Sequence, residues 1–262
     1  MTGPDRPSAD WPPADRPSAD RLPSPQRAAL PDWMQDIAAA AASVRPEQMS
    51  AFLPPAEGGR RSAVLMLFGE SERDGRTVAD LLLIERAHDM RSHAGQPAFP
   101  GGAVDPGDEG PVGAALREAA EETGVDPHGV DVVAMLPDLW LPPSGFVVTP
   151  VIAWWRQPSA VSVVDPAEVA SVHRVALDDL LHADNRLRVR HPSGHEGPAF
   201  RVHGLLVWGF TAGLLARLLE VAGLERPWDR TRVEDLPDDL LRMAMRSAAH
   251  PGLFRDSPEG SA

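Results

Sequence analysis

The stretch Phe99–Val125, FPGGAVDPGDEGPVGAALREAAEETGV, carries the strongest fold signal in this chain. Its first half contains proline and several glycines, so the backbone there turns tightly and can approach a ligand closely. Its second half has the composition of a helix over about Val112–Glu122. Pro111 suits the first turn of that helix and Gly124 suits a left-handed cap at its end. The stretch therefore predicts a glycine-lined bend that leads directly into a helix.

Three glutamates share one face of this predicted helix. Glu118, Glu121 and Glu122 stand at positions i, i+3 and i+4, which brings their carboxylates together. Two carboxylates held ~4 Å apart repel by about 1 kcal/mol in water and about 4 kcal/mol at an effective dielectric of 20. Mg²⁺ or Mn²⁺ would reverse the sign of that interaction, because hard divalent cations favour carboxylate oxygens. A solvated helix face with weak ion pairs is the alternative explanation.

The composition narrows the class of protein. Lys and Arg number 25 against 38 Asp and Glu, and the formal net charge of -13 argues against a sequence-independent grip on nucleic acid. An acidic protein that handles phosphate must neutralise it with metal, arginines or backbone N–H groups. The absence of cysteine excludes disulfides, thiolate-ligated metals and a thiol nucleophile.

The chain divides into one folded domain and its extensions. The hexapeptide DRPSAD occurs twice within residues 1–28, a Pro/Ala-rich stretch that predicts a disordered extension. Residues 29–61 follow as a helix and a loop, residues 62–225 as the domain itself, and residues 226–262 as a helix and a polar tail. The uncharged run Gly204–Ala216 is shorter than the ~20 residues of a membrane span, so we expect a cytoplasmic location and no membrane partner.

The apolar pattern predicts a mixed α/β sheet with helices packed on its faces. Ser62–Phe68 and Leu81–Ile84 are apolar runs on either side of Asp74–Gly75, a hairpin signal. Further strands are expected at Val130–Leu136, Phe146–Trp155, Val169–Val175 and Phe200–Val202. Helices are expected at Pro31–Val44, at Leu205–Val221 as a long closing helix, and from about Asp235 onward.

Ala103–Val125 resembles the Nudix box, a motif of Gly, five residues, Glu, seven residues and Arg-Glu-aliphatic-any-Glu-Glu-any-Gly-aliphatic. The matching positions are Glu109, Arg117, Glu118, Glu121, Glu122, Gly124 and Val125. One position departs from the motif, because Ala103 stands where the box opens with glycine. The resemblance implies a Nudix fold and metal-dependent hydrolysis of a phosphoanhydride, with Mg²⁺ or Mn²⁺ held by Glu118, Glu121 and Glu122. We further expect Arg117 to pair with Glu109 and to orient the ligands.

The segment before the box resembles the signature of the coenzyme A pyrophosphatase branch of this family. In LLLIERAHDMRSHAGQPAFPGG, Leu81–Gly102, the matching positions are Arg86, Arg91, His93 and Gly95. Ser144–Trp154 and Val207–Leu218 are similar to further segments of the same branch. This resemblance implies hydrolysis of coenzyme A or acyl-CoA to 3',5'-ADP and (acyl-)4'-phosphopantetheine.

Five residues are candidates for substrate binding: Arg86, Arg91, His93, Gly101 and Gly102. Arg91 and His93 offer positive charge to a 3'-phosphate or to the diphosphate. The alternative is that Arg86 and Arg91 pair with nearby acids such as Glu85 and Asp89, and that His93 is a buried turn residue.

Glu121, Glu122 and Glu168 are the candidate catalytic residues. A general base near pH 7 is a carboxylate with a raised pKa or a water activated by metal. Glu168 lies in DPAEVASVHRVALDDL, where similar members of the family often place an acid. A turn acid beside Asp165 is the alternative interpretation of Glu168.

Other functions are compatible with the same motif. The first alternative is a Nudix hydrolase of another diphosphate, such as NADH, ADP-ribose or a nucleoside triphosphate, and the second is a Nudix-fold binding module without catalysis. The expected partner is a small-molecule diphosphate and no nucleic acid, and the sequence leaves a homodimer open. His191–Gly197 gathers two histidines and a serine among Pro and Gly, but a hairpin turn is favoured over a metal site or a catalytic triad because no nucleophile elbow surrounds Ser193.

Overall fold

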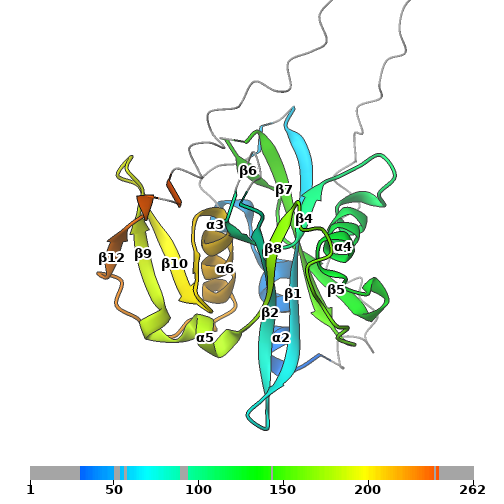
Figure 1. Ribbon diagram of the computed structural model, residues 1–262, viewed down its shortest axis with the longest axis horizontal. Helices are drawn as coiled ribbons and strands as arrows, with labels where there is room; N and C mark the ends of the chain where they lie inside the picture. The colour runs from blue at the N-terminus through cyan, green and yellow to red at the C-terminus, as the bar shows by residue number, and fades with distance from the viewer. Residues whose placement is uncertain are drawn as a thin grey trace, which may run out of the picture.

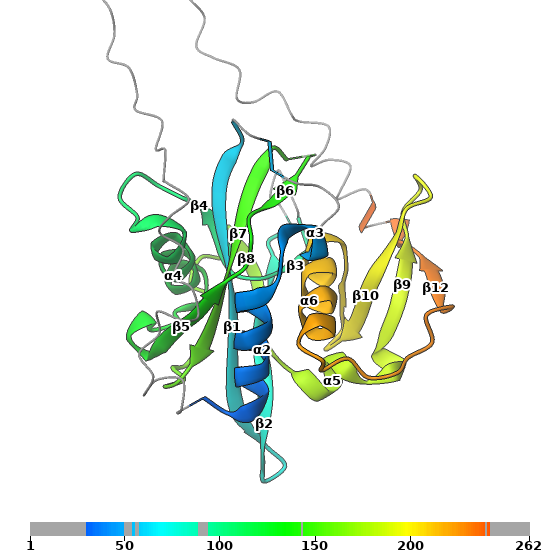
Figure 2. The same ribbon diagram turned by 180° about the vertical axis from the view of Figure 1, so that it is seen from behind.

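The computed structural model describes residues 30–49, 54–55, 58–88, 94–142, 144–238 and 240–241. The residues predicted as a disordered extension, 1–28, lie outside this part of the chain, and so do Arg91 and His93. Two β-sheets organise the described residues, one of eight strands and one of four. Figures 1 and 2 show helices on both faces of the larger sheet and the smaller sheet at one side of it.

The larger sheet is built on the hairpin of β1 (Arg60–Arg73) and β2 (Arg76–Arg86). Asp74 and Gly75 turn the chain with φ angles of 52° and 72°, the left-handed conformation that suits a two-residue hairpin. The predicted hairpin is therefore confirmed. β1 also pairs in parallel with β7 (Phe146–Trp155), while its other neighbours are antiparallel, so the predicted mixed sheet is confirmed as well.

The remaining strands extend this hairpin on both sides. β8 (Val169–Ala176) pairs with β2, and the register shifts at Glu85 and Arg86. The others are β3 (Pro97–Ala98), β4 (Gly101–Ala103), β5 (Val130–Met135) and β6 (Leu139–Leu141). The predicted strands at Val130–Leu136, Phe146–Trp155 and Val169–Val175 are confirmed to within a residue.

Helix α4 (Gly110–Thr123) covers one face of the larger sheet. It begins with a proline in its first turn and ends at Gly124, whose φ of 74° gives the predicted left-handed cap. Small side chains of the helix, Ala114, Ala115 and Ala119, pack against Leu65, Leu67 and Ala153 of the sheet. These alanines let the helix approach the sheet closely. The polar residues of the box lie on other sides of the helix.

The other face of the larger sheet holds the main hydrophobic core. α2 (Asp32–Ser43), which confirms the predicted N-terminal helix, buries Met34 and Ile37 there. α6 (Gly209–Val221) packs on the same side, and Figure 2 shows it between the two sheets. Short helical segments complete the fold: α3 (Pro46–Met49), η2 (Pro127–Gly129), α5 (Leu177–Leu181) and η3 (Ala183–Asn185).

The smaller sheet contains β9 (Arg186–Arg190), β10 (Glu196–Val202), β11 (Leu205–Val207) and β12 (Val233–Asp235). β9, β10 and β11 are antiparallel, and β12 runs parallel to β9. The β9–β10 connection is closed by a hydrogen bond from His191 N to His195 O. The favoured hairpin at His191–Gly197 is therefore confirmed, whereas most of this sheet was not predicted.

The prediction of one helix over Leu205–Val221 is wrong in its first part. Leu205–Val207 is strand β11, and the helix begins only at Gly209. His203 and Gly204, with φ angles of 51° and 79°, reverse the chain so that β11 pairs with β10. A short apolar run of this kind has no periodicity that distinguishes a strand from a buried helix.

The helix predicted from about Asp235 also needs correction at its start. Asp235 ends strand β12, and the chain is helical at Asp238, Leu240 and Leu241. The rest of that predicted helix, including Met243 and Met245, lies outside the described residues.

The contact between β4 and β1 allows only glycine at position 101. A Cβ added to Gly101 would lie 2.3 Å from Ala63 O and 2.7 Å from the Cα of Val64, both backbone atoms. We expect Gly101→Ala to lower the free energy of unfolding by roughly 1–3 kcal/mol or more, measured by urea denaturation. Gly107→Ala is the control, because a Cβ there would meet no atom within 4 Å in the described part of the chain. Equal effects of both changes would contradict this close approach.

Candidate active site

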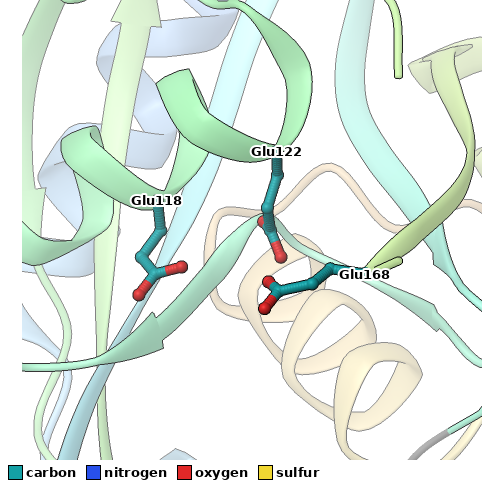
Figure 3. A group of neighbouring side chains, drawn as sticks. All are labelled: Glu118, Glu122 and Glu168. Atoms are coloured by element: carbon teal, nitrogen blue, oxygen red, sulfur yellow. The ribbon is translucent and has the colours of Figure 1, made fainter. Parts of the chain in front are cut away.

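The carboxylates of Glu118, Glu122 and Glu168 converge, and ligand oxygens from all three lie within 4.8 Å of one another. Figure 3 shows Glu118 and Glu122 one turn apart on α4, with Glu168 reaching toward them from the segment before β8. Glu122 is buried, Glu118 is half-buried and Glu168 is exposed. The exposure of the three carboxylates therefore increases from Glu122, in the interior, to Glu168, at the surface.

Backbone hydrogen bonds hold Glu168 opposite the helix. Its carbonyl accepts from Ala87 N at 2.8 Å, just past the end of β2, and its own N–H donates to Asp165 O. The two interpretations of Glu168 are compatible, because its backbone forms a turn with Asp165 while its side chain faces α4.

The loop between β7 and β8 is tied to the end of α4. Ser162 N donates to Thr123 O and Val164 N donates to Glu122 O. These two bonds satisfy carbonyls that a helix end otherwise leaves without intrahelical partners. The same loop thus caps the helix and continues to Glu168.

Glu122 is a buried acid with few partners. Its side chain is 2% exposed, and its Oε2 accepts from Gly101 N at 3.0 Å. Arg86 Nη1 lies 3.8 Å from Oε1, and neither Oε1 nor Arg86 Nε has a hydrogen-bond partner among the described residues. Burial raises the pKa of Glu122 to about 7, against the opposing effects of Arg86 and the Gly101 N–H. Burial prevails because the arginine is beyond hydrogen-bonding distance.

Glu118 lies against the bend that precedes the helix. A Cβ added to Gly102 would lie 2.3 Å from its Oε1, so the absence of a side chain at position 102 makes room for this carboxylate. Burial raises the pKa of Glu118, and repulsion from Glu121 and Glu168 adds to that effect. Arg117, with Nη1 3.0 Å from Oε1, acts in the opposite direction.

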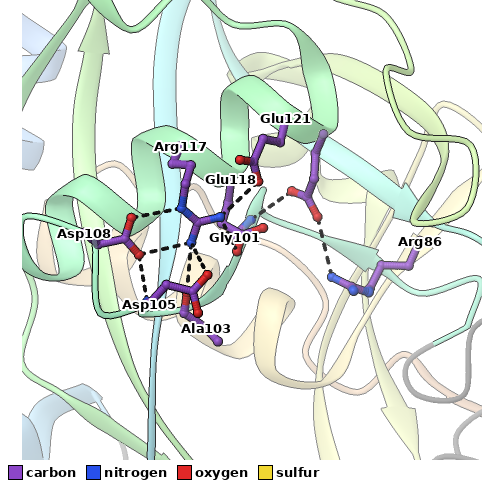
Figure 4. Close-up of polar contacts among 9 residues, drawn as sticks. Arg86, Gly101, Ala103, Asp105, Asp108, Arg117, Glu118 and Glu121 are labelled. Atoms are coloured by element: carbon purple, nitrogen blue, oxygen red, sulfur yellow. Dashed lines mark hydrogen bonds and ion pairs between the residues drawn. The ribbon is translucent and has the colours of Figure 1, made fainter.

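Arg117 joins the bend to the helix, as Figure 4 shows. Its Nε and Nη2 donate to the two carboxylate oxygens of Asp108 at 2.9 and 3.1 Å, and Nη2 also donates to Ala103 O at 3.1 Å. Its Nη1 donates to Glu118 at 3.0 Å and to Glu121 at 2.9 Å. One guanidinium therefore fixes both sides of the site.

The acid that anchors Arg117 is Asp108, whereas Glu109 was predicted for this contact. Asp108 also accepts from Asp105 N at 2.8 Å, which closes the loop and turns its carboxylate toward the arginine. The hydrogen bond with Arg117 is the main cause that holds the pKa of Asp108 below its ordinary value. Glu109 instead occupies the cap position before α4, without a side-chain cap bond. The Asp105–Asp108 spacing is a turn signal that sequence reasoning did not use.

Glu121 departs from the expected trio. Its side chain is 60% exposed, and Arg117, one turn earlier on the helix, holds its carboxylate. Such an i, i+4 pair is a common contact on a helix surface. The structure brings Glu118 and Glu122 together as expected and adds Glu168, while Glu121 lies on the Arg117 side.

The clustered oxygens fit a hard divalent cation. The donors are all carboxylates, one buried oxygen of Glu122 has no hydrogen-bond partner among the residues that the structure describes, and the pKa values of Glu118 and Glu122 are both raised. A cation such as Mg²⁺ or Mn²⁺ would relieve the repulsion among these acids.

Three of the five residues expected to bind substrate, Arg86, Gly101 and Gly102, lie at the glutamate cluster. Arg86 faces Glu122, whereas its suggested partner Glu85 accepts from Ser171 Oγ at 2.8 Å. Gly101 and Gly102 both contact glutamates of the cluster, contacts that sequence reasoning missed.

A model of the NUDIX domain matches residues 59–193, which include the bend, helix α4 and all three clustered glutamates. The chain belongs to the Nudix family. It is therefore a Nudix hydrolase, a member of a family of pyrophosphohydrolases that act on nucleoside diphosphate derivatives and typically use a divalent metal.

Curated relatives carry the same family name. The chain is 39% identical over 166 residues to the uncharacterized Nudix hydrolase NudL of Citrobacter koseri, an alignment that covers 61% of this chain and 81% of the relative. NudL of Escherichia coli K12 is 36% identical over 173 residues, covering 63% and 84%. The crystal structure of the Nudix hydrolase RenU from M. smegmatis matches with a TM-score of 0.42 and 24% identity, covering 64% and 88%.

The lengths and compositions of the helices bear on whether the chain could cross a membrane. Within the described ranges, no helix of this hydrolase combines the length and the apolar character that crossing a membrane requires.

The raised pKa of Glu122 makes stability depend on pH. Between about 4.5, the ordinary pKa, and about 7, the folded protein binds more protons than the unfolded chain. In metal-free buffer the free energy of unfolding should therefore fall as pH rises through this window, by roughly 3 kcal/mol, and stay low above it. Glu122→Gln should remove this fall, as measured by urea denaturation at pH 5 and pH 8.

Glu121→Gln is the matched control, because its carboxylate is exposed and it should keep the wild-type pH dependence. If the free energy of unfolding fell equally with pH in wild type and in Glu122→Gln, the raised pKa of Glu122 would be contradicted.

Proposed function

We propose that this Nudix hydrolase cleaves the diphosphate of coenzyme A or acyl-CoA, giving 3',5'-ADP and (acyl-)4'-phosphopantetheine. The observation that carries the proposal is the position of Arg86. It is the first matching position of the Leu81–Gly102 segment, which resembles the coenzyme A pyrophosphatase signature. Its guanidinium lies beside Glu122 with Nε free of a hydrogen-bond partner in the described part of the chain. A free guanidinium donor at an acidic cluster is suited to a phosphate oxygen.

Glu118, Glu122 and Glu168 are the proposed ligands of Mg²⁺ or Mn²⁺. When bound, the ion supplies Lewis-acid polarisation of the diphosphate oxygens and lowers the pKa of a water molecule. Arg117 positions Glu118 through its bonds to Asp108 and to the Ala103 carbonyl. The ligands would therefore be pre-oriented by the chain before substrate arrives.

Glu168 is the proposed general base. It is the most exposed member of the cluster, so an attacking water can lie beside its carboxylate. Water attacks phosphorus, the P–O bond to the bridging oxygen breaks, and the proton of the water passes to the carboxylate. Glu121 and Glu122 were the other catalytic candidates. Glu121 is exposed but is bound by Arg117 outside the cluster, and Glu122 is buried, so neither offers water a carboxylate within the cluster.

Replacing Glu168 tests this arrangement of acids. We expect Glu168→Gln to lower kcat on the order of a hundredfold or more and to weaken Mn²⁺ binding. Glu121→Gln removes the same charge from a residue that faces Arg117, and it should have a clearly smaller effect on both quantities. Turnover is followed by mass spectrometry of the products, in a screen that also includes NADH, ADP-ribose and nucleoside triphosphates. A larger loss in Glu121→Gln than in Glu168→Gln would reject the proposed ligand set.

The substrate assignment has a separate test at Arg91. We expect Arg91→Ala to reduce kcat/KM for coenzyme A about tenfold while leaving dephospho-coenzyme A nearly unchanged, because only the former carries the 3'-phosphate. Arg86→Ala is the matched control, since an arginine at the diphosphate should affect both substrates equally. Equal losses for the two substrates in Arg91→Ala would count against 3'-phosphate recognition by this residue.

A further inference from the structure

A groove lies between α6 and the inner face of the smaller sheet. Its volume is about 490 Å³, within the range of small-molecule sites. Four arginines line it: Arg186 and Arg188 from β9, Arg217 from α6 and Arg230 from the segment that follows α6. We call it the arginine groove. It shares no residue with the glutamate cluster.

The residues that line the arginine groove carry a net positive charge, whereas the whole chain is negative. Three glutamates line it beside the four arginines, although the chain carries a net charge of -13. Arg188 pairs with Glu196 at 3.3 Å and Arg217 pairs with Glu220 at 2.6 Å. Glu225 serves two arginines, Arg186 at 3.1 Å and Arg230 at 2.8 Å. The lining therefore has one cation more than it has carboxylates.

Arg186 is the buried member of this set. Its side chain is 1% exposed, and its guanidinium lies between the rings of Phe200 and Trp228, 5.1 and 4.7 Å from their centroids. Its Nη1 has the ionic contact with Glu225 but no hydrogen-bond partner in the described ranges. Burial lowers the pKa of Arg186, and Glu225 offsets this effect only in part. A buried cation with an open donor favours a further anion.

The wall formed by α6 leaves room for a ligand. Gly213 and Ala216 line the groove, and a Cβ added to Gly213 would meet no atom of the described residues within 4 Å. Glycine in a helix interior costs about 1 kcal/mol relative to alanine. The open space at Gly213 is therefore not explained by helix stability.

We propose that the arginine groove binds the phosphate group of a small molecule, at a site separate from the catalytic one. A carboxylate would only reproduce what the three glutamates already provide. A phosphate carries about -1.5 to -2 charges at pH 7 and three strong acceptor oxygens, so it can engage several guanidiniums at once. The guanidiniums of Arg186 and Arg230 both lie against Trp228, so this ring holds arginines and is not available to stack a base.

Binding is tested by calorimetric titration of the full chain with inorganic phosphate in EDTA, which removes metal-dependent binding at the glutamate cluster. Wild type should show saturable binding, and acetate should bind at least tenfold more weakly. Arg188→Gln should weaken phosphate binding about tenfold. Arg201→Gln is the matched control, because Arg201 pairs with Glu234 and is not part of the groove lining. It should bind phosphate as wild type does.

Two further variants keep the test independent of arginine loss. Gly213→Leu fills the open space on α6 and should abolish phosphate binding without lowering Tm. Glu220→Gln removes the carboxylate that pairs with Arg217 and should tighten binding severalfold. The proposal is overturned if wild type shows no saturable binding of phosphate, if acetate binds as tightly, or if Arg201→Gln weakens binding as much as Arg188→Gln.

Discussion

The burial of one carboxylate, that of Glu122, is the constraint on which the rest of the candidate active site depends. An acid in such a position is tolerated only with compensation, and here a backbone N–H from Gly101 and a distant guanidinium from Arg86 provide part of it. The remaining imbalance appears as a pKa of about 7. A cluster of carboxylates that repel one another favours the binding of a cation, because a cation compensates their negative charge.

The fold supplies this constraint through close packing. The alanines of α4 allow the helix to approach β1, and the glycines of β4 allow the bend to pass between them. The glutamates are therefore fixed by backbone on two sides. Arg117 and Asp108 then connect bend and helix, so the acidic side chains are held by a rigid framework and not by their own rotamer preferences.

Much of this arrangement could be predicted from sequence, and the failures have physical causes. The helix, its Pro111 start and its Gly124 cap follow from local rules, as does the β1–β2 hairpin. The partner of Arg117 did not follow, because a loop of Pro, Gly and Asp can present either Asp108 or Glu109, and only the Asp105–Asp108 turn decides between them. Glu121 was displaced from the expected trio by a helix-surface ion pair. The smaller sheet was largely missed because β12 is short and pairs with β9 over a long separation, and because the apolar run of β11 has no period that distinguishes it from the helix that follows.

The loop from Gln157 to Asp165 would ordinarily be regarded as a surface connection that tolerates changes in length. Its amides, however, bind the last carbonyls of α4, and it then leads directly to Glu168. Ala87 N holds the carbonyl of Glu168 at the end of β2, so the loop must span the distance between two fixed points. Because these anchoring bonds come from backbone groups, a change of side chains in the loop leaves them in place, whereas a change in its length has to be absorbed between the end of α4 and the start of β8.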